Sequence, residues 1–224
     1  MTIREGHCSG VTMAEKNALI IVDVQNDFLP GGALAVRNGD AVIAPINAIS
    51  PGFALVMATQ DWHPANHLSF AANHAGKKVG EVIDLDGLPQ VLWPAHCVQN
   101  TAGAALADGL AQKRIARIFQ KGIDPAIDSY SGFYDNGHRR STGLGEFLRQ
   151  QGVLDVYVAG LATDYCVKAT VMDSVQLGFK THLIADACRA VDLSAGDGER
   201  AIEQMRGAAV DVVHSSVLQG RGLV

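Results

Sequence analysis

The sequence predicts a three-layer α/β/α domain built on a central six-stranded parallel sheet. Six short apolar runs of strand length alternate with segments whose apolar residues recur at helical spacing. The runs are apolar almost throughout, which is typical of strands whose two faces are both covered by helices. The chain has 224 residues, of which 48% are hydrophobic. A single domain of this length buries roughly 70% of its unfolded surface.

Strands and helices are expected to alternate along most of the chain. The predicted strands are residues 18–22, 54–59, 115–120, 154–159, 181–185 and 210–213. The predicted helices are residues 40–49, 144–151, 164–177 and 197–206. In residues 1–15 the apolar residues recur at neither helical nor strand spacing. We therefore interpret them as a loose N-terminal extension and expect a single domain over residues 16–224.

Residues 61–114 interrupt this alternation and carry little regular pattern. They are rich in Gly, Pro, His and Asn, and they contain both tryptophans. A stretch of this length without periodicity inside a compact domain is usually functional or disordered. We expect it to contribute to a functional site.

The composition narrows the classes of partner. The formal net charge is -5, and Lys and Arg are scattered rather than clustered, so nucleic acid is not expected as a partner. No apolar run is long enough to span a membrane. We expect small molecules or further copies of the same chain. The four cysteines show no CxxC spacing and no secretory signal precedes them, which favours reduced thiols in the cytoplasm.

Chemically active residues follow most of the predicted strands directly. In doubly wound sheets, ligands bind beyond the carboxyl ends of the strands. The residues at these places are Asp23, Asp61, Lys121, the turn 160–166, Asp186 and His214. Surface loops also carry titratable side chains, so position alone does not show that these residues form a functional site.

Cys166 lies just past the fourth predicted strand and at the start of a predicted helix. Free N–H groups at a helix start stabilise a thiolate, and they can also hold an oxyanion. Thr163 or Asp164 is expected to cap this helix. The alternative is that Cys166 is a small buried hydrophobic residue.

Asp23 and Lys121 each end a predicted strand and complete a Cys–Asp–Lys group. The carboxylate would accept the thiol proton, and the ammonium would keep the carboxylate ionised and favour the thiolate. Taken singly, Asp23 could instead cap a turn and Lys121 could extend from a sheet edge to solvent.

A second group of residues has the composition of a metal site. Its members are Asp61, His63, His67 and His96. A carboxylate with imidazoles suits Zn, Fe or Mn, and three protein ligands leave positions open for water or substrate. The alternative is a set of solvated histidines, which the neighbouring Trp62 and Trp93 disfavour.

Five longer segments follow one another along the chain. They are IIVDVQNDF, TQDWHPANH, WPAHCVQ, the KG…YSGF stretch from Lys121 to Phe133, and GLATDYCV. In this order they resemble the motifs of bacterial nicotinamidases, which belong to the isochorismatase-like hydrolase superfamily. The resemblance covers residues 18–213 and implies a sheet of order 3-2-1-4-5-6.

The resemblance also implies a role for individual residues. The implied catalytic residues are Asp23, Lys121 and Cys166. The implied ligands of one divalent metal ion per chain are Asp61, His63 and His96, and His67 matches a further histidine that binds the metal in some members. The implied oxyanion hole consists of the amides of Ala162 and Cys166, next to a cis peptide bond between Leu161 and Ala162. The implied substrate pocket contains Phe28, Trp93, Tyr130 and Leu161.

The implied reaction hydrolyses nicotinamide to nicotinate and ammonia through a thioester on the cysteine, as a step of NAD salvage. The metal would orient the pyridine nitrogen, and pyrazinamide is expected to be cleaved as well. The implied strand order places the strand of Lys121 two strands from that of Asp23, a gap of about 10 Å. Lys121 must therefore reach across the intervening strand.

Other functions fit less well. Isochorismatases proper lack a cysteine at the matching place. Amidases acting on carbamoyl compounds share the catalytic residues, but their substrates offer no pyridine nitrogen to a metal. A non-catalytic metal-binding homologue is the alternative from another class, although every catalytic position is filled. A dinucleotide-binding dehydrogenase is disfavoured because no GxGxxG follows the first strand.

Overall fold

The computed structural model describes residues 16–219, which contain a six-stranded sheet. The order is β5-β2-β1-β6-β7-β8, and all neighbouring strands are parallel. The strands are β1 (Lys16–Val22), β2 (Leu55–Asp61), β5 (Arg117–Lys121), β6 (Val153–Leu161), β7 (Lys180–Arg189) and β8 (Asp211–Val213). The predicted fold class and the implied strand order are confirmed. The predicted extension at residues 1–15 lies outside the described residues.

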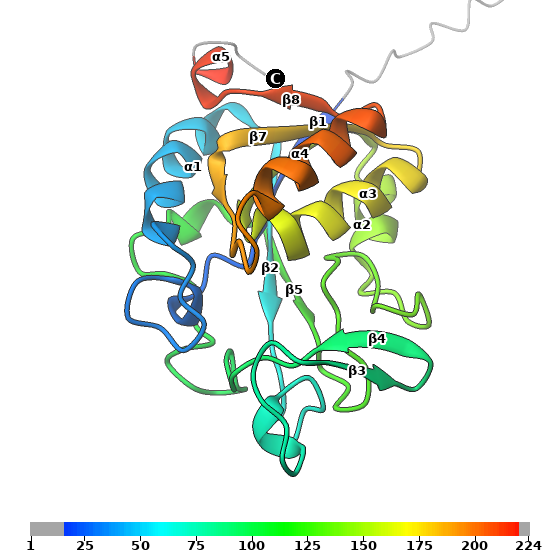
Figure 1. Cartoon of the computed structure of the whole chain (residues 1–224). Coiled ribbons are helices and arrows are strands. Elements are labelled where there is room, and N and C mark those ends of the chain that lie inside the picture. Colours follow the sequence, from blue (N-terminus) through cyan, green and yellow to red (C-terminus); the bar gives the residue numbers. More distant parts are fainter. Residues whose placement is uncertain (1–15, 220–224) are drawn as a thin grey trace, which may run out of the picture.

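Helices cover both faces of this sheet (Figure 1). One face carries α1 (Ile43–Ile49) and the short α5 (Ser215–Leu218), and the other carries α2 (Leu144–Gln150), α3 (Lys168–Gln176) and α4 (Asp197–Gly207). Alternate residues of β1 enter the two cores: Leu19 packs on the α1 side and Ile20 on the α2 side. Because both faces are buried, β1 is apolar at successive positions instead of alternating.

The stretch 61–114 contains a β-hairpin that the sequence analysis missed. Strands β3 (Val82–Leu85) and β4 (Leu88–Val91) pair in antiparallel fashion. Asp86 and Gly87 connect them with φ values of 53° and 81°, the left-handed pair for which Asp-Gly is favoured in two-residue turns. The remainder of the stretch forms short turns and isolated bridges, in agreement with the predicted lack of periodicity.

The carboxyl ends of β1 and β6 lie in close contact. Gly160 of β6 pairs with Val22 of β1 and has a φ of 125°. A Cβ at Gly160 would lie 2.1 Å from the carbonyl oxygen of Val22, so only glycine fits there. This approach brings the residues after β6 beside those after β1. Within residues 16–219, no helix is long and apolar enough to cross a membrane.

Candidate active site

Asp23, Lys121 and Cys166 meet at the carboxyl edge of the sheet. Asp23 directly follows β1 with a φ of 47°, and Lys121 is the last residue of β5. Cys166 lies in a π-helical turn, Thr163–Val167, that leads into α3. All three side chains are buried. The chain segments that carry them are far apart in sequence, and the parallel sheet places their ends together.

The Lys121 ammonium lies at the centre of this group and is fully buried. Its Nζ lies 2.9 Å from Oδ2 of Asp23 and 3.4 Å from Sγ of Cys166. It also donates to the carbonyl oxygen of Ser129 at 2.8 Å. Lys121 therefore reaches across β2 to Asp23, as the strand order requires.

Lys121 has a second ion pair, which the sequence analysis did not anticipate. Its Nζ lies 2.5 Å from Oδ1 of Asp61. Asp61 and Lys121 are register partners at the ends of β2 and β5, so adjacent strands present the two side chains together. One buried ammonium therefore joins Asp23 and the thiol on one side to Asp61 on the other.

The two carboxylates that share Lys121 differ in pKa. Burial raises the pKa of Asp23 to about 6, although Lys121 opposes the shift. Burial acts on Asp61 in the same direction, but Lys121 and His63 together outweigh it and hold the pKa of Asp61 well below its usual range. Burial also outweighs Lys121 at Cys166 and raises the pKa of the thiol well above its usual value. At neutral pH a protonated thiol therefore lies beside an ionised Asp23.

The start of the helix at Cys166 differs from the prediction. Ala162, with extended backbone, is the residue before the first turn, and no side chain caps that turn. Asp164 instead accepts the backbone N–H groups of Val191 and Asp192, each at 2.9 Å. The predicted capping role of Thr163 or Asp164 is therefore wrong, because the Asp164 carboxylate turns to the loop after β7.

Ala162 carries one feature that the resemblance implied for this turn and one that was not predicted. The peptide bond between Leu161 and Ala162 is cis, as expected. The carbonyl oxygen of Ala162 accepts the backbone N–H groups of Tyr165 at 3.1 Å and Val167 at 3.0 Å. In the described chain, the N–H of Cys166 between them does not donate to this carbonyl. The turn thus accommodates the thiol residue without using its amide in the cap.

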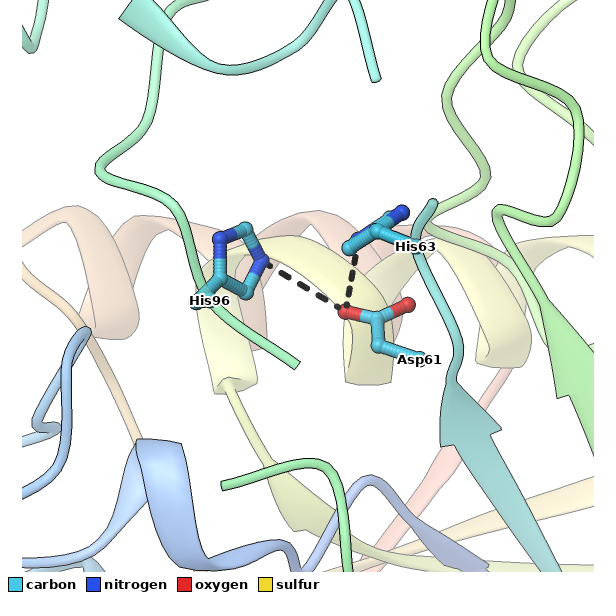
Figure 2. A group of neighbouring side chains, drawn as sticks. All are labelled: Asp61, His63 and His96. Carbon is cyan, nitrogen blue, oxygen red and sulfur yellow. Dashed lines mark ion pairs between the residues drawn. The ribbon is translucent and has the colours of Figure 1, made fainter. Parts of the chain in front are cut away.

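Asp61, His63 and His96 form a compact buried group beside Lys121 (Figure 2). The Oδ2 atom of Asp61 lies 3.6 Å from Nε2 of His63 and 3.8 Å from Nε2 of His96. Burial and His63 lower the pKa of His96 to about 4, so its ring is uncharged at neutral pH. One carboxylate oxygen and two imidazole nitrogens thus face a common centre, which fits a divalent transition metal.

Backbone carbonyls orient both of these rings. The carbonyl oxygen of Gly122 lies 2.9 Å from Nδ1 of His63, and that of Pro94 lies 2.9 Å from Nδ1 of His96. Such contacts fix the orientation of metal-binding histidines. Gly122 has a φ of 64°, and a Cβ there would lie 2.3 Å from Cε1 of His63. Glycine is therefore required next to the His63 ring.

His67 is buried nearby, outside this group of three. It belongs with His63 and Asp128 to a second group whose potential ligand atoms lie within 4.8 Å of one another. Asp128 was not identified from the sequence. It lies in the segment before the YSGF motif, and no spacing rule distinguishes it from the other aspartates there.

A narrow cavity of about 30 Å³ opens onto Cys166, Asp61 and His96. The predicted pocket residues Phe28, Trp93 and Tyr130 line it. Residues that the sequence analysis missed also line it, namely Leu34, Asp128, Tyr165 and Val191. The Tyr165 ring makes edge contacts with Trp93 and Tyr130, so three aromatic rings form one wall.

Three residues from the sequence analysis lie away from this cavity. Leu161, expected to line the pocket, is 1% exposed and packs in the core on the α1 side; its neighbour Ala162 lines the cavity instead. Asp186 was expected to follow a strand but lies within β7, whereas His214 directly follows β8; Nε2 of His214 lies 3.4 Å from Oδ2 of Asp186. Asp186 additionally bonds to Ser215, which fixes the start of α5.

Comparison with known proteins agrees with this geometry. The family model described as the isochorismatase domain matches residues 17–216. The chain belongs to the isochorismatase family. The nicotinamidase of Escherichia coli is 50% identical over 196 residues, which cover 85% of this chain and 91% of that protein.

Solved structures extend the likeness within the isochorismatase family. The Acinetobacter baumannii nicotinamidase and pyrazinamidase superposes with a TM-score of 0.88 at 46% identity, covering 92% of this chain and 99% of that chain. The Pyrococcus horikoshii pyrazinamidase, solved in complex with zinc, has a TM-score of 0.73 at 38% identity and covers 89% of this chain and 99% of that chain. A divalent metal is thus supported both by a zinc-bound relative and by the donor set of Asp61, His63 and His96.

Proposed function

We propose that this chain is a nicotinamidase, which hydrolyses nicotinamide to nicotinate and ammonia in NAD salvage. The observation that carries the proposal is the position of Lys121, whose ammonium contacts Asp23, the Cys166 thiol and Asp61 at once. It joins a nucleophile and its base to a metal-binding group across one narrow aromatic cavity. The similarity to curated nicotinamidases supports the same reaction.

The first half of the reaction forms a thioester on Cys166. The Asp23 carboxylate accepts the thiol proton, and the sulfur attacks the carboxamide carbon and forms a C–S bond. Asp23 then donates this proton to the amide nitrogen as the C–N bond breaks, and ammonia leaves. The Lys121 ammonium, held by both carboxylates, stabilises the charge that passes between thiol and carboxylate.

The second half releases nicotinate. Asp23 accepts a proton from a water molecule, whose oxygen attacks the thioester carbon, and the departing sulfur regains the proton from Asp23. Both halves place negative charge on the former carbonyl oxygen. We assign the backbone N–H groups of Ala162 and Cys166 to this oxygen, since donors of this kind contribute about 3–4 kcal/mol each in other enzymes.

We further propose that Asp61, His63 and His96 hold one Zn, Fe or Mn ion per chain. When bound, the ion would act as a Lewis acid toward the ring nitrogen of the substrate. Phe28, Trp93 and Tyr130 would enclose the flat ring. Pyrazinamide offers a nitrogen and a carboxamide in the same relation, so we expect the enzyme to cleave it too.

Ammonia release from nicotinamide by metal-loaded wild type tests the proposal. We expect turnover of nicotinamide and of pyrazinamide, and none of a carbamoyl amide such as N-carbamoylsarcosine. The reverse preference would assign the chain to the carbamoyl amidases. Turnover of neither class by metal-loaded enzyme would favour a non-catalytic metal-binding homologue.

The remaining expectations about the chain are proposals as well. Cys97, Cys166 and Cys188 are free thiols in the structure, which supports a reducing compartment such as the cytoplasm. A single domain over residues 16–224 and self-association of the chain stay predictions from the sequence.

A further inference from the structure

In the described chain, the last residue of β2 has a strand beside it on one side only. β1 pairs with β2 from Leu55 to Ala58, and the chain leaves the sheet at Asp23, where the backbone has a φ of 47°. Asp61 pairs with Lys121 of β5 but lies beyond the end of the β1 ladder. Its backbone N–H and C=O need other partners, because buried peptide groups are nearly always hydrogen-bonded.

The side chain of Gln25 supplies both partners. Its Oε1 accepts the backbone N–H of Asp61 at 2.8 Å, and its Nε2 donates to the carbonyl oxygen of Asp61 at 2.8 Å. The same Nε2 also donates to the carbonyl oxygen of Ala104 at 2.9 Å. Gln25 is 0% exposed, and hydrogen bonds are stronger in such a buried environment than in water. The amide thus satisfies the peptide groups that a longer β1 would have paired.

The position of Asp61 matters to both halves of the site, because its carboxylate has partners in two directions. Its Oδ1 lies 2.5 Å from Nζ of Lys121, and its Oδ2 lies 3.6 Å and 3.8 Å from Nε2 of His63 and His96. Successive side chains of a strand point to opposite faces. A rotation of the Asp61 peptide would therefore carry the carboxylate away from the ammonium and the imidazoles together.

The segment that carries Gln25 also carries the proposed base. The backbone N–H of Gln25 donates to the carbonyl oxygen of Asp23 at 2.8 Å. Gln25 therefore holds Asp61 in a fixed relation to Asp23 through the backbone. This connection is separate from the Lys121 ammonium, which joins the same two carboxylates through ion pairs.

We propose that Gln25 is a positioning residue of the site. By bonding to both peptide groups of Asp61, it holds the Asp61 carboxylate between Lys121 and the metal-binding histidines. The proposal rests on the metal site and the reaction assigned above, and it adds to them a residue that does not line the cavity. Gln25 lies within the segment IIVDVQNDF, but the sequence analysis gave it no role.

The affinity of the metal-free protein for Zn²⁺ separates positioning from a general structural role. Gln25→Met keeps the size of the side chain and removes the hydrogen bonds to Asp61 and Ala104. We expect its affinity for Zn²⁺ to fall by about 10–100-fold, as is usual when a group that orients a metal ligand is lost. Urea unfolding of the metal-free variant, recorded beside it, shows that the protein measured is folded.

Asn47→Leu is the matched control. The amide of Asn47 also joins a backbone N–H and a carbonyl oxygen, those of Ala111 and Gly109, at 2.8 Å each. None of these residues lines the cavity, so we expect the affinity for Zn²⁺ to stay at the wild-type level. Wild-type affinity in folded Gln25→Met, or an equal loss of affinity in Asn47→Leu, would overturn the proposal.

Hydrogen exchange of the metal-free wild type, followed by NMR, tests the contact and needs no variant to fold. We expect slow exchange of the side-chain amide hydrogens of Gln25 and of the backbone amide hydrogen of Asp61. The side-chain amide of the exposed Gln204 should exchange fast. Equally fast exchange at Gln25 would contradict the inference. The proposed function fails separately, if wild type binds no metal or does not cleave nicotinamide, and the exchange rates then still decide whether Gln25 holds Asp61.

Discussion

The site has two halves that use the same buried ammonium in opposite ways. In the thiol half, Asp23 pairs with Lys121 and accepts the Thr59 hydroxyl at 2.6 Å. In the metal half, Asp61 pairs with Lys121 and also faces His63 and His96. Burial raises the pKa of Asp23 to about 6, whereas Lys121 and His63 overcome burial and lower the pKa of Asp61.

The difference lies in how many positive or polar neighbours each carboxylate has. Asp23 has one cation to offset its burial, so it can exchange a proton near neutral pH. Asp61 has a cation and two imidazoles, so it keeps its negative charge. One half is therefore suited to proton transfer and the other to holding a cation.

Removing the nucleophile should have the largest effect. We expect Cys166→Ala to lower kcat for nicotinamide by at least about 10⁴-fold, because loss of a nucleophile in comparable enzymes removes most of the rate enhancement. Its metal content should stay at the wild-type level, since Cys166 lies in the other half. Ammonia release and elemental analysis measure the two effects. Retained turnover would exclude a covalent route through Cys166.

Lys121→Met should damage both halves together. It leaves two buried carboxylates without their cation, so we expect the free energy of unfolding to fall by about 3–5 kcal/mol and turnover to be lost. Lys180→Met is the control. Lys180 forms an ion pair with Asp155 but is 66% exposed, so its removal should change the free energy of unfolding little. Equal losses in the two variants, measured by urea unfolding, would contradict the central role of Lys121.

His96→Ala should affect only the metal half. We expect bound metal to fall, KM for nicotinamide to rise and the unfolding midpoint of the metal-free protein to change little. A chelator should reproduce the rise in KM in wild type, because it removes the same ion. Unchanged metal content in His96→Ala would remove His96 from the ligand set.

Gly122→Ala should disturb the metal half without touching a ligand. The added Cβ would lie 2.5 Å from Nδ1 of His63, and the backbone has a φ of 64°, so the ring must shift. We expect metal affinity to fall by about 10–100-fold. Gly207→Ala in α4 is the control, since its Cβ meets nothing within 4 Å. Equal metal affinity in both variants would show that the His63 ring tolerates displacement.

A change of pH should have the mildest effect. The pH dependence of kcat/KM for nicotinamide should reflect the ionisation of Asp23 in the thiol half. Asp23 accepts a proton only when ionised, and its pKa is about 6. As the pH falls below this value, Asp23 becomes protonated, and kcat/KM for nicotinamide should fall by about tenfold per pH unit. Burial raises the pKa of the Cys166 thiol well above its usual value, so the thiol stays protonated across this range and does not produce the acid limb. A profile that is flat between pH 5 and about 7 would remove Asp23 as the base.

Much of the fold was predictable because strands such as β1 are buried on both faces, so that its residues 18–22 form an unbroken apolar run. The hairpin β3–β4 was missed, although Asp86 and Gly87 carry the turn signal. Its outward residues are exposed, for example Val82 at 62%, so no apolar run marks it. The four-residue α5 is too short to show a helical period.

The candidate site was predictable where residues end strands, and less so elsewhere. Asp23 and Lys121 follow apolar runs directly, whereas the ion pair between Asp61 and Lys121 depends on the register of β2 and β5. Sequence spacing does not give that register. Tyr165 and Asp128 reach the cavity from a π-helical turn and an irregular loop, so no period indicated where their side chains point.

The covalent link between substrate and Cys166 tests the account most directly. Wild type mixed with nicotinamide is quenched in acid within one turnover, and intact-protein and peptide mass spectra are recorded beside those of Cys166→Ala. The account predicts one nicotinoyl group on the peptide that contains Cys166, and none in the alanine variant. Rapid turnover with no adduct on wild type, or an adduct on a different residue, would contradict it.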